Sequence, residues 1–157
     1  MPELWYPAAA HRDGPADKQG YNSDTSPYPK AGVTIHSMQG VVGEALKMLD
    51  NVSLEKSWHF SITQIGQVYQ HYPANAVAWH CANYFGNRTT IGIEMEGGPP
   101  GNLSEPLTTW QIDTLVTLLR WLWAEWEWGP ARLRVNMWEH GWLVATACPS
   151  GRIPWGR

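Results

Sequence analysis

The most regular pattern of apolar and polar positions in the chain lies between residues 108 and 128. Apolar side chains recur there every three or four residues, which is typical of one buried face of an α-helix. Thr108 or Thr109 can cap the start of this helix, and Gly129-Pro130 ends it. The buried stripe consists of Ile112, Leu115, Val116, Leu119, Leu122 and Trp123. The same spacing predicts a second, shorter helix over residues 41–49.

Short β-prone segments alternate with these helices. Residues 90–96 show the clearest alternation, in which Ile91, Ile93 and Met95 are separated by Gly92 and glutamates, so Glu94 is predicted to face away from the isoleucines. Further strands are predicted at residues 32–36, 58–62, 67–72, 77–80 and 133–137. Residues 64–66 form the turn of a hairpin, and residues 83–88 and 97–102 are predicted loops.

Interleaved strands and helices predict an α/β (α+β) domain with one central mixed β-sheet flanked by helices. We assign this single domain to residues 31–157. Residues 1–30 are rich in Pro, Gly, Asp and Ser and show no periodicity, so we expect an extended N-terminal arm rather than a second domain. Tryptophans crowd the end of the long helix, and they either pack against this arm or form a binding surface.

The composition narrows the class of protein. Of 157 residues, 43% are hydrophobic and 16% are charged, which excludes a disordered chain. A net charge of −3 without a basic stripe argues against nucleic acid as a partner. No stretch approaches the roughly 20 apolar residues of a membrane span, so no membrane insertion is expected. The N-terminus lacks the features of a secretory signal, and we expect a monomer made in the cytoplasm.

Two histidines and one cysteine are the candidate metal ligands. His36 lies beside the first predicted strand, His140 follows the last one, and Cys148 opens a Cys-Pro-Ser-Gly turn. Two imidazoles and one thiolate suit zinc and leave a fourth position for water, as in hydrolytic sites. Taken singly, each of the three could be a structural residue. A disulfide between Cys81 and Cys148 is not expected, because two cysteines make no disulfide framework and pairing would consume the thiolate.

Several short motifs place this trio in a wider pattern. They are VTIH at 33–36, WHFSI at 58–62, GQVYQ at 66–70, AWHCA at 78–82, Asn87 with IGIE at 91–94, and the segment from Glu139-His140 to Cys148-Pro149. In this order they resemble the type 2 N-acetylmuramoyl-L-alanine amidases over roughly residues 32–155. That zinc-dependent family includes phage lysozyme-like amidases, bacterial muropeptide amidases and animal peptidoglycan-recognition proteins.

The resemblance implies that His36, His140 and Cys148 hold one Zn²⁺ ion. It also implies hydrolysis of the amide between the lactyl group of N-acetylmuramic acid and L-alanine, with bacterial peptidoglycan or muropeptides as the partner. Many family members carry Asp as the third ligand, whereas the phage lysozyme-like and recognition-protein branches commonly carry Cys. Members that only bind the cell wall often lack the Cys, so Cys148 favours catalysis.

The resemblance further assigns roles around the metal. Glu94 is the candidate proton carrier, with a solvated strand carboxylate as the alternative. Thr146 stands where relatives use Lys or Thr to steady an oxyanion, although it could simply stabilise a turn. Trp58 replaces the Tyr of several relatives and forms either a substrate-stacking wall or core packing. Asn87 and His80 are candidate substrate-binding residues, and His80 could instead act behind a ligand or serve as a structural imidazole.

Four functions follow from these assignments. An amidase without a signal peptide resembles a phage endolysin, which is made in the cytoplasm and acts at the cell wall. A cytoplasmic muropeptide-recycling amidase fits the same features. A non-catalytic peptidoglycan-binding module and a Cys–His hydrolase, with Cys148 as nucleophile and His140 as base, are the competing classes.

Overall fold

A computed structural model of the chain describes residues 2–21, 28–98 and 104–156, so most of the predicted loop at 97–102 lies outside the described residues. The strands are β1 (Ala10–His11), β2 (Gly32–Ser37), β3 (Phe60–Ile62), β4 (Val68–Gln70), β5 (Thr90–Met95) and β6 (Met137–Glu139). The helices are α1 (Val42–Asp50), α2 (Tyr84–Thr89) and α3 (Thr109–Trp126), with short 3₁₀ helices η1 (Ala16–Lys18) and η2 (His140–Trp142). The structure therefore confirms the predicted mixed sheet flanked by helices.

The six strands form one sheet in the order β1-β4-β3-β5-β2-β6. Only the β3–β4 hairpin is antiparallel, and every other neighbouring pair is parallel. The carboxyl ends of β2, β5 and β6 therefore lie together at one edge of the sheet, where parallel-sheet proteins place their ligands. The register sets His36 opposite Glu94, and Ile35 opposite Glu139.

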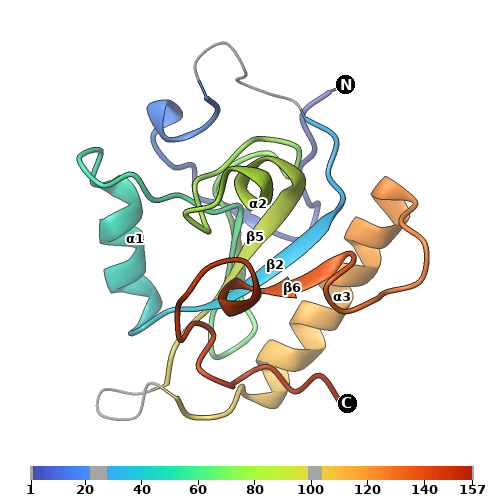
Figure 1. Ribbon diagram of the computed structural model, residues 1–157. Coiled ribbons are helices and arrows are strands. Elements are labelled where there is room, and N and C mark those ends of the chain that lie inside the picture. Colours follow the sequence, from blue (N-terminus) through green and yellow to red (C-terminus); the bar gives the residue numbers. More distant parts are fainter. Residues whose placement is uncertain (1, 22–27, 99–103, 157) are drawn as a thin grey trace.

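The two faces of the sheet have different neighbours. Figure 1 shows α3 on one side of the sheet and α1 on the other. Ile35, Ile93 and Leu118 belong to one buried apolar cluster, so the inward stripe of α3 packs on the face that carries the isoleucines. Thr108 caps α3 through a reciprocal capping box with Gln111, which confirms the predicted start of the helix. The opposite face of β2 and β5 is left to carry His36 and Glu94.

The N-terminal segment contributes to the sheet. Residues Ala10–His11 pair with β4 as the edge strand β1, an element that the sequence pattern did not predict. Lys18 is almost fully buried, and its ammonium group donates hydrogen bonds to the carbonyl oxygens of Met48, Leu49 and Asn51 at the end of α1. Those carbonyls have no partner within the helix, so Lys18 ties this segment to α1.

The tryptophans at the end of α3 pack against the protein. Trp121 lies against Tyr6, with 4.9 Å between ring centroids, so the contact with the N-terminal segment is present. The indole of Trp128 donates to the carbonyl oxygen of Lys30, and that of Trp123 donates to Gly129. These partly buried rings extend the core rather than form a free surface.

Three predicted segments are wrong. Residues 83–88 are not a loop, because the Asn83 side chain accepts a hydrogen bond from the Gly86 amide and caps α2. Residues 77–80 form only an isolated bridge at Ala78, since the amides of Trp79 and His80 bond to side chains instead of a strand. The last strand begins at Met137 rather than near residue 133, because Arg134 adopts a left-handed conformation in a turn.

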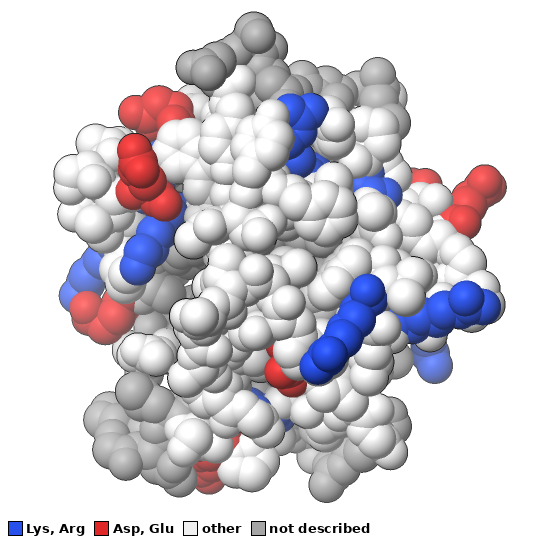
Figure 2. Space-filling view, in the orientation of Figure 1, with Lys and Arg blue, Asp and Glu red and all other residues white. Residues whose placement is uncertain are grey.

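The surface agrees with the charge balance. In Figure 2, lysines, arginines and acidic residues are interspersed on the face shown, without a continuous basic stripe. Within the described parts of the chain, no helix is both long and apolar enough to cross a membrane.

Candidate active site

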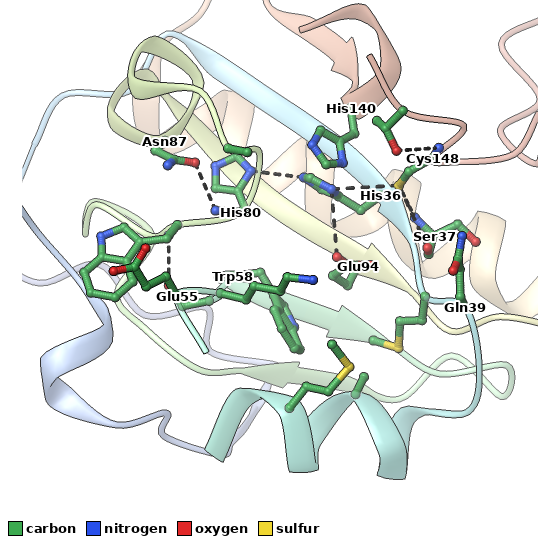
Figure 3. Close-up of a pocket in the computed structure, with 18 of the residues that line it drawn as sticks. His36, Ser37, Gln39, Glu55, Trp58, His80, Asn87, Glu94, His140 and Cys148 are labelled. Carbon is green, nitrogen blue, oxygen red and sulfur yellow. Dashed lines mark hydrogen bonds and ion pairs between the residues drawn. The ribbon is translucent and has the colours of Figure 1, made fainter. Parts of the chain in front are cut away.

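A pocket of about 880 Å³ opens at the carboxyl ends of β2 and β5. Its wall contains all eight residues that the sequence assigned to the site, which are His36, Trp58, His80, Asn87, Glu94, His140, Thr146 and Cys148. Figure 3 shows His36 and His140 side by side above Glu94, with Cys148 beside them. His36 comes from β2, Glu94 from β5 and His140 from η2, and Cys148 lies in the segment after η2. They meet where the parallel strands end.

The three predicted ligands lie close together. One donor atom from each of His36, His140 and Cys148 lies within 4.8 Å of the others, and the His36 Nδ1 to Cys148 Sγ distance is 4.0 Å. Donor atoms around a tetrahedral zinc ion are about 3.5 Å apart, given its usual bond lengths. The cluster is therefore slightly wider than a zinc site and needs a shift of about 1 Å to become one.

Unpartnered atoms at this point support the fit of a cation. Among the described residues, only three buried side-chain polar atoms lack a hydrogen-bond partner, and two of them are Glu94 Oε2 and His140 Nε2. Leaving a buried polar atom unpartnered is costly, so such atoms often mark a ligand position. The donor set of two imidazoles and a thiol is one that zinc prefers.

The electrostatics of the ligand groups suit a metal site. Burial, followed by the neighbouring His80 and His140, lowers the pKa of His36 well below its ordinary value, so this imidazole stays neutral and can donate a lone pair. Burial, reinforced by Glu94, raises the pKa of the Cys148 thiol to about 12. A thiol with so high a pKa is a poor nucleophile without a nearby cation, which disfavours the Cys–His hydrolase.

Glu94 lies beside the cluster, as its strand alternation predicts. Its carboxylate is 3.8 Å from His36 Nδ1, and 17% of its side chain is exposed, on the pocket side. Burial raises its pKa to about 8, and Lys56 offsets part of that rise. A carboxyl with a pKa near neutrality can both accept and return a proton.

Trp58 and Thr146 have structural contacts as well as positions in the pocket. Trp58 is 6% exposed, its indole donates to Ser61 Oγ, and it packs in one apolar cluster with Leu49 of α1 and Tyr72. The Thr146 hydroxyl oxygen accepts a hydrogen bond from the Cys148 amide at 3.3 Å, which stabilises the turn that carries the cysteine. Thr146 is otherwise exposed, so its hydroxyl can still reach a substrate in the pocket.

His80 and Asn87 form the inner wall of the pocket. Both are more than 90% buried, and their polar atoms are turned to protein groups. Substrate binding by these two residues therefore stays a prediction, while a contact between His80 and His36 is present in the structure.

The sequence did not predict the residues that hold Cys148 in place, which are Ser37 and Arg152. The backbone amide of Ser37 donates to Cys148 Sγ at 3.3 Å, and the Arg152 guanidinium donates to Ser37 Oγ at 2.6 Å. Arg152 also donates to the carbonyl oxygens of Glu96 and Glu105, so it ties the segment after Cys148 to the ends of β2 and β5. No local sequence pattern distinguishes Arg152 from a surface arginine. Only its position shortly after Cys148 in the sequence suggests a role near the site.

The pattern that defines the N-acetylmuramoyl-L-alanine amidases matches residues 18–151. The chain belongs to this family. The match covers most of the chain, and it confirms both the resemblance drawn from the motifs and the prediction of an amidase. Among curated proteins, no sequence matches this amidase significantly.

Solved structures of similar proteins support the fold. The N-acetylmuramoyl-L-alanine amidase LysC from Clostridium intestinale URNW is 20% identical, with a TM-score of 0.69 over 96% of this chain and 93% of its own. The catalytic domain of XlyA is 25% identical, with a TM-score of 0.66 over 89% and 88%. An AmpD derivative is 19% identical, with a TM-score of 0.73 over 99% and 94%.

The raised pKa of Glu94 predicts a pH-dependent penalty in the metal-free protein. The folded state keeps this carboxyl protonated up to about pH 8, whereas the unfolded chain ionises it near 4.5. Because the unfolded state then binds fewer protons, this group opposes folding increasingly between about pH 5 and 8. We expect Glu94→Gln to gain stability over wild type across this interval and to differ least near pH 4. Urea unfolding with chelator at these pH values measures the difference, and a pH-independent difference would contradict the prediction.

Proposed function

We propose that this amidase is a zinc-dependent enzyme of bacterial cell-wall lysis that cleaves the bond between N-acetylmuramic acid and L-alanine. The observation that carries the proposal is the cluster of His36, His140 and Cys148 in the wall of a pocket, with a carboxylate beside it. Zinc in such a site supplies a Lewis acid for the scissile carbonyl and makes water a competent nucleophile near neutral pH.

The protein's own groups then divide the remaining work. Glu94 takes the proton from the attacking water and returns it to the leaving amine, so that acid and base chemistry share one carboxylate. The Thr146 hydroxyl donates a hydrogen bond to the developing oxyanion, without the positive charge that a lysine would bring. Trp58 lines the same pocket and forms a wall against which the substrate can stack.

The third ligand supports a lytic role over a recycling one. Cysteine at this position resembles the phage lysozyme-like and recognition-protein branches, whereas many other relatives carry Asp. A muropeptide-recycling enzyme is the alternative, and a non-catalytic binding module is disfavoured because Glu94 and all three ligands are present together.

Cys148 provides the first test of zinc dependence. We expect wild-type protein to bind one zinc ion per chain and to release amine termini from purified peptidoglycan, with activity lost on chelation and recovered with zinc. Cys148→Ala removes one of three protein ligands and should lose both metal and activity. Cys148→Asp keeps a ligand and should retain zinc and part of the activity.

Metal analysis beside an amine-release assay checks these three proteins. A fully metallated and active Cys148→Ala would refute the site. Activity that survives chelation but is lost in Cys148→Asp would instead support the thiol-nucleophile mechanism. Bound zinc without amine release by the wild type would support a binding module.

Glu94 is tested separately from the metal. Glu94→Gln keeps the size of the side chain but cannot carry the proton, so we expect kcat to fall about 10²–10⁴-fold with zinc content unchanged. Glu55→Gln is the matched control, because Glu55 is an exposed carboxylate at the same pocket and lies outside the ligand cluster. Equal kcat values for the Glu94→Gln variant and wild type would remove Glu94 from the mechanism.

The substrate decides between the two biological roles. A lytic enzyme must act on intact sacculi, whereas a recycling enzyme needs only soluble muropeptides. We expect amine release and loss of turbidity from sacculi at a rate comparable with that on muropeptides. Activity restricted to soluble muropeptides would overturn the endolysin-like role while leaving the amidase reaction intact.

A further inference from the structure

His80 contacts His36, the first proposed ligand, on the side of its ring away from Cys148. Its Nδ1 lies 3.0 Å from His36 Nε2, and its own Nε2 lies 3.2 Å from the carbonyl oxygen of Thr90. A carbonyl oxygen only accepts, so His80 Nε2 must carry a hydrogen. In the neutral ring this leaves His80 Nδ1 as an acceptor, and the hydrogen between the two rings then belongs to His36 Nε2.

The consequence for His36 is a defined tautomer. With its hydrogen on Nε2, the lone pair lies on Nδ1, which is the atom facing Cys148 and Glu94. Both rings are almost fully buried, and burial lowers the pKa of each well below its ordinary value, in keeping with neutral imidazoles. Figure 3 shows a dashed line between the two rings, with His36 between His80 and Cys148.

The second proposed ligand has a buried ring nitrogen without a hydrogen-bond partner, which is His140 Nε2. Unlike His36, it shows no hydrogen bond with His80 among the described residues, so a fixed tautomer is inferred for His36.

The dipeptide His80-Cys81 is itself held rigidly. The side-chain oxygen of Asn87 accepts hydrogen bonds from both of its backbone amides, at 3.0 and 2.9 Å. The His80 ring lies on Gly92 of β5, where a Cβ atom would stand 2.5 Å from the ring. Any larger residue at position 92 would push His80 away from His36.

We propose that His80, anchored by Asn87, is a positioning residue that fixes His36 in its metal-binding tautomer before a metal arrives. The inference rests on the proposed zinc site but not on catalysis. Groups that orient a ligand histidine in this way commonly affect metal affinity about 10–100-fold.

Histidine tautomers in the metal-free wild type provide the direct test. Long-range ¹H–¹⁵N NMR at about pH 7.5 distinguishes the protonated ring nitrogen of each assigned histidine. We expect hydrogen on Nε2 of both His36 and His80. Hydrogen on His36 Nδ1, or averaging of its tautomers, would overturn the proposal. This measurement needs neither zinc nor a variant.

Zinc affinity gives a second, independent readout. His80→Leu removes the acceptor for His36, and competition with a chromophoric chelator should show zinc binding weakened about 10–100-fold. His80→Asn places an amide oxygen near the position of Nδ1 and should recover most of this loss. The control is His71→Leu, because the His71 ring is also buried but bonds the Ser61 hydroxyl and the Arg12 carbonyl oxygen, away from the proposed ligands.

The outcomes separate the two proposals. Wild-type affinity in a folded His80→Leu, or equally weak binding by the Asn and Leu variants, would contradict the positioning role. Absence of zinc binding by the wild type would overturn the proposed function instead, while the NMR result would still decide the tautomers. If His80→Leu does not fold, the wild-type spectrum and His80→Asn carry the test.

Discussion

The parallel alignment of β2 with β5 and β6 is the constraint on which the rest of this structure depends. Backbone pairing places His36 opposite Glu94. Strand β6 also pairs with β2, so His140, which follows β6, lies at the same edge of the sheet. A shift of one residue in either pairing would turn these side chains to the face covered by α3. The isoleucines of β2 and β5 prevent that shift, because their burial against α3 requires the opposite set of residues to face the pocket. Core packing therefore positions the chemistry.

The titratable side chains of the site are buried in their uncharged forms, and His36 is hydrogen-bonded to His80 on the side away from Cys148. Burying an imidazole or a carboxyl favours its uncharged form, and the raised pKa of Glu94 and lowered pKa of His36 both reflect this. The hydrogen bond between His36 Nε2 and His80 leaves His36 Nδ1 open towards Cys148. A cation there would reverse the preference of Glu94 and Cys148 for their protonated forms, so metal binding and proton release are coupled.

The sequence alone predicted the parts that follow from local periodicity. Alternation in residues 90–96 gave the orientation of Glu94, the stripe after Thr108 gave α3, and ordered motifs gave the family. The remaining elements depend on contacts between segments far apart in the chain. Helix α2 exists because Asn83 caps it, and the strand at Ala10–His11 forms only because β4 offers an edge. The contact between His80 and His36 depends on the Asn87 side-chain oxygen, which accepts hydrogen bonds from the His80 and Cys81 amides, and no local pattern reveals this.

Zinc K-edge X-ray absorption of the metal-loaded protein tests the central claim most directly. Bound zinc should show one sulfur scatterer at about 2.3 Å, from Cys148, and nitrogen or oxygen scatterers at about 2.0–2.1 Å, from the two histidines and a solvent oxygen. The sulfur contribution should disappear in Cys148→Asp while the shorter shell remains. A wild-type spectrum without sulfur, or one with more than one sulfur per zinc, would contradict the site built from His36, His140 and Cys148.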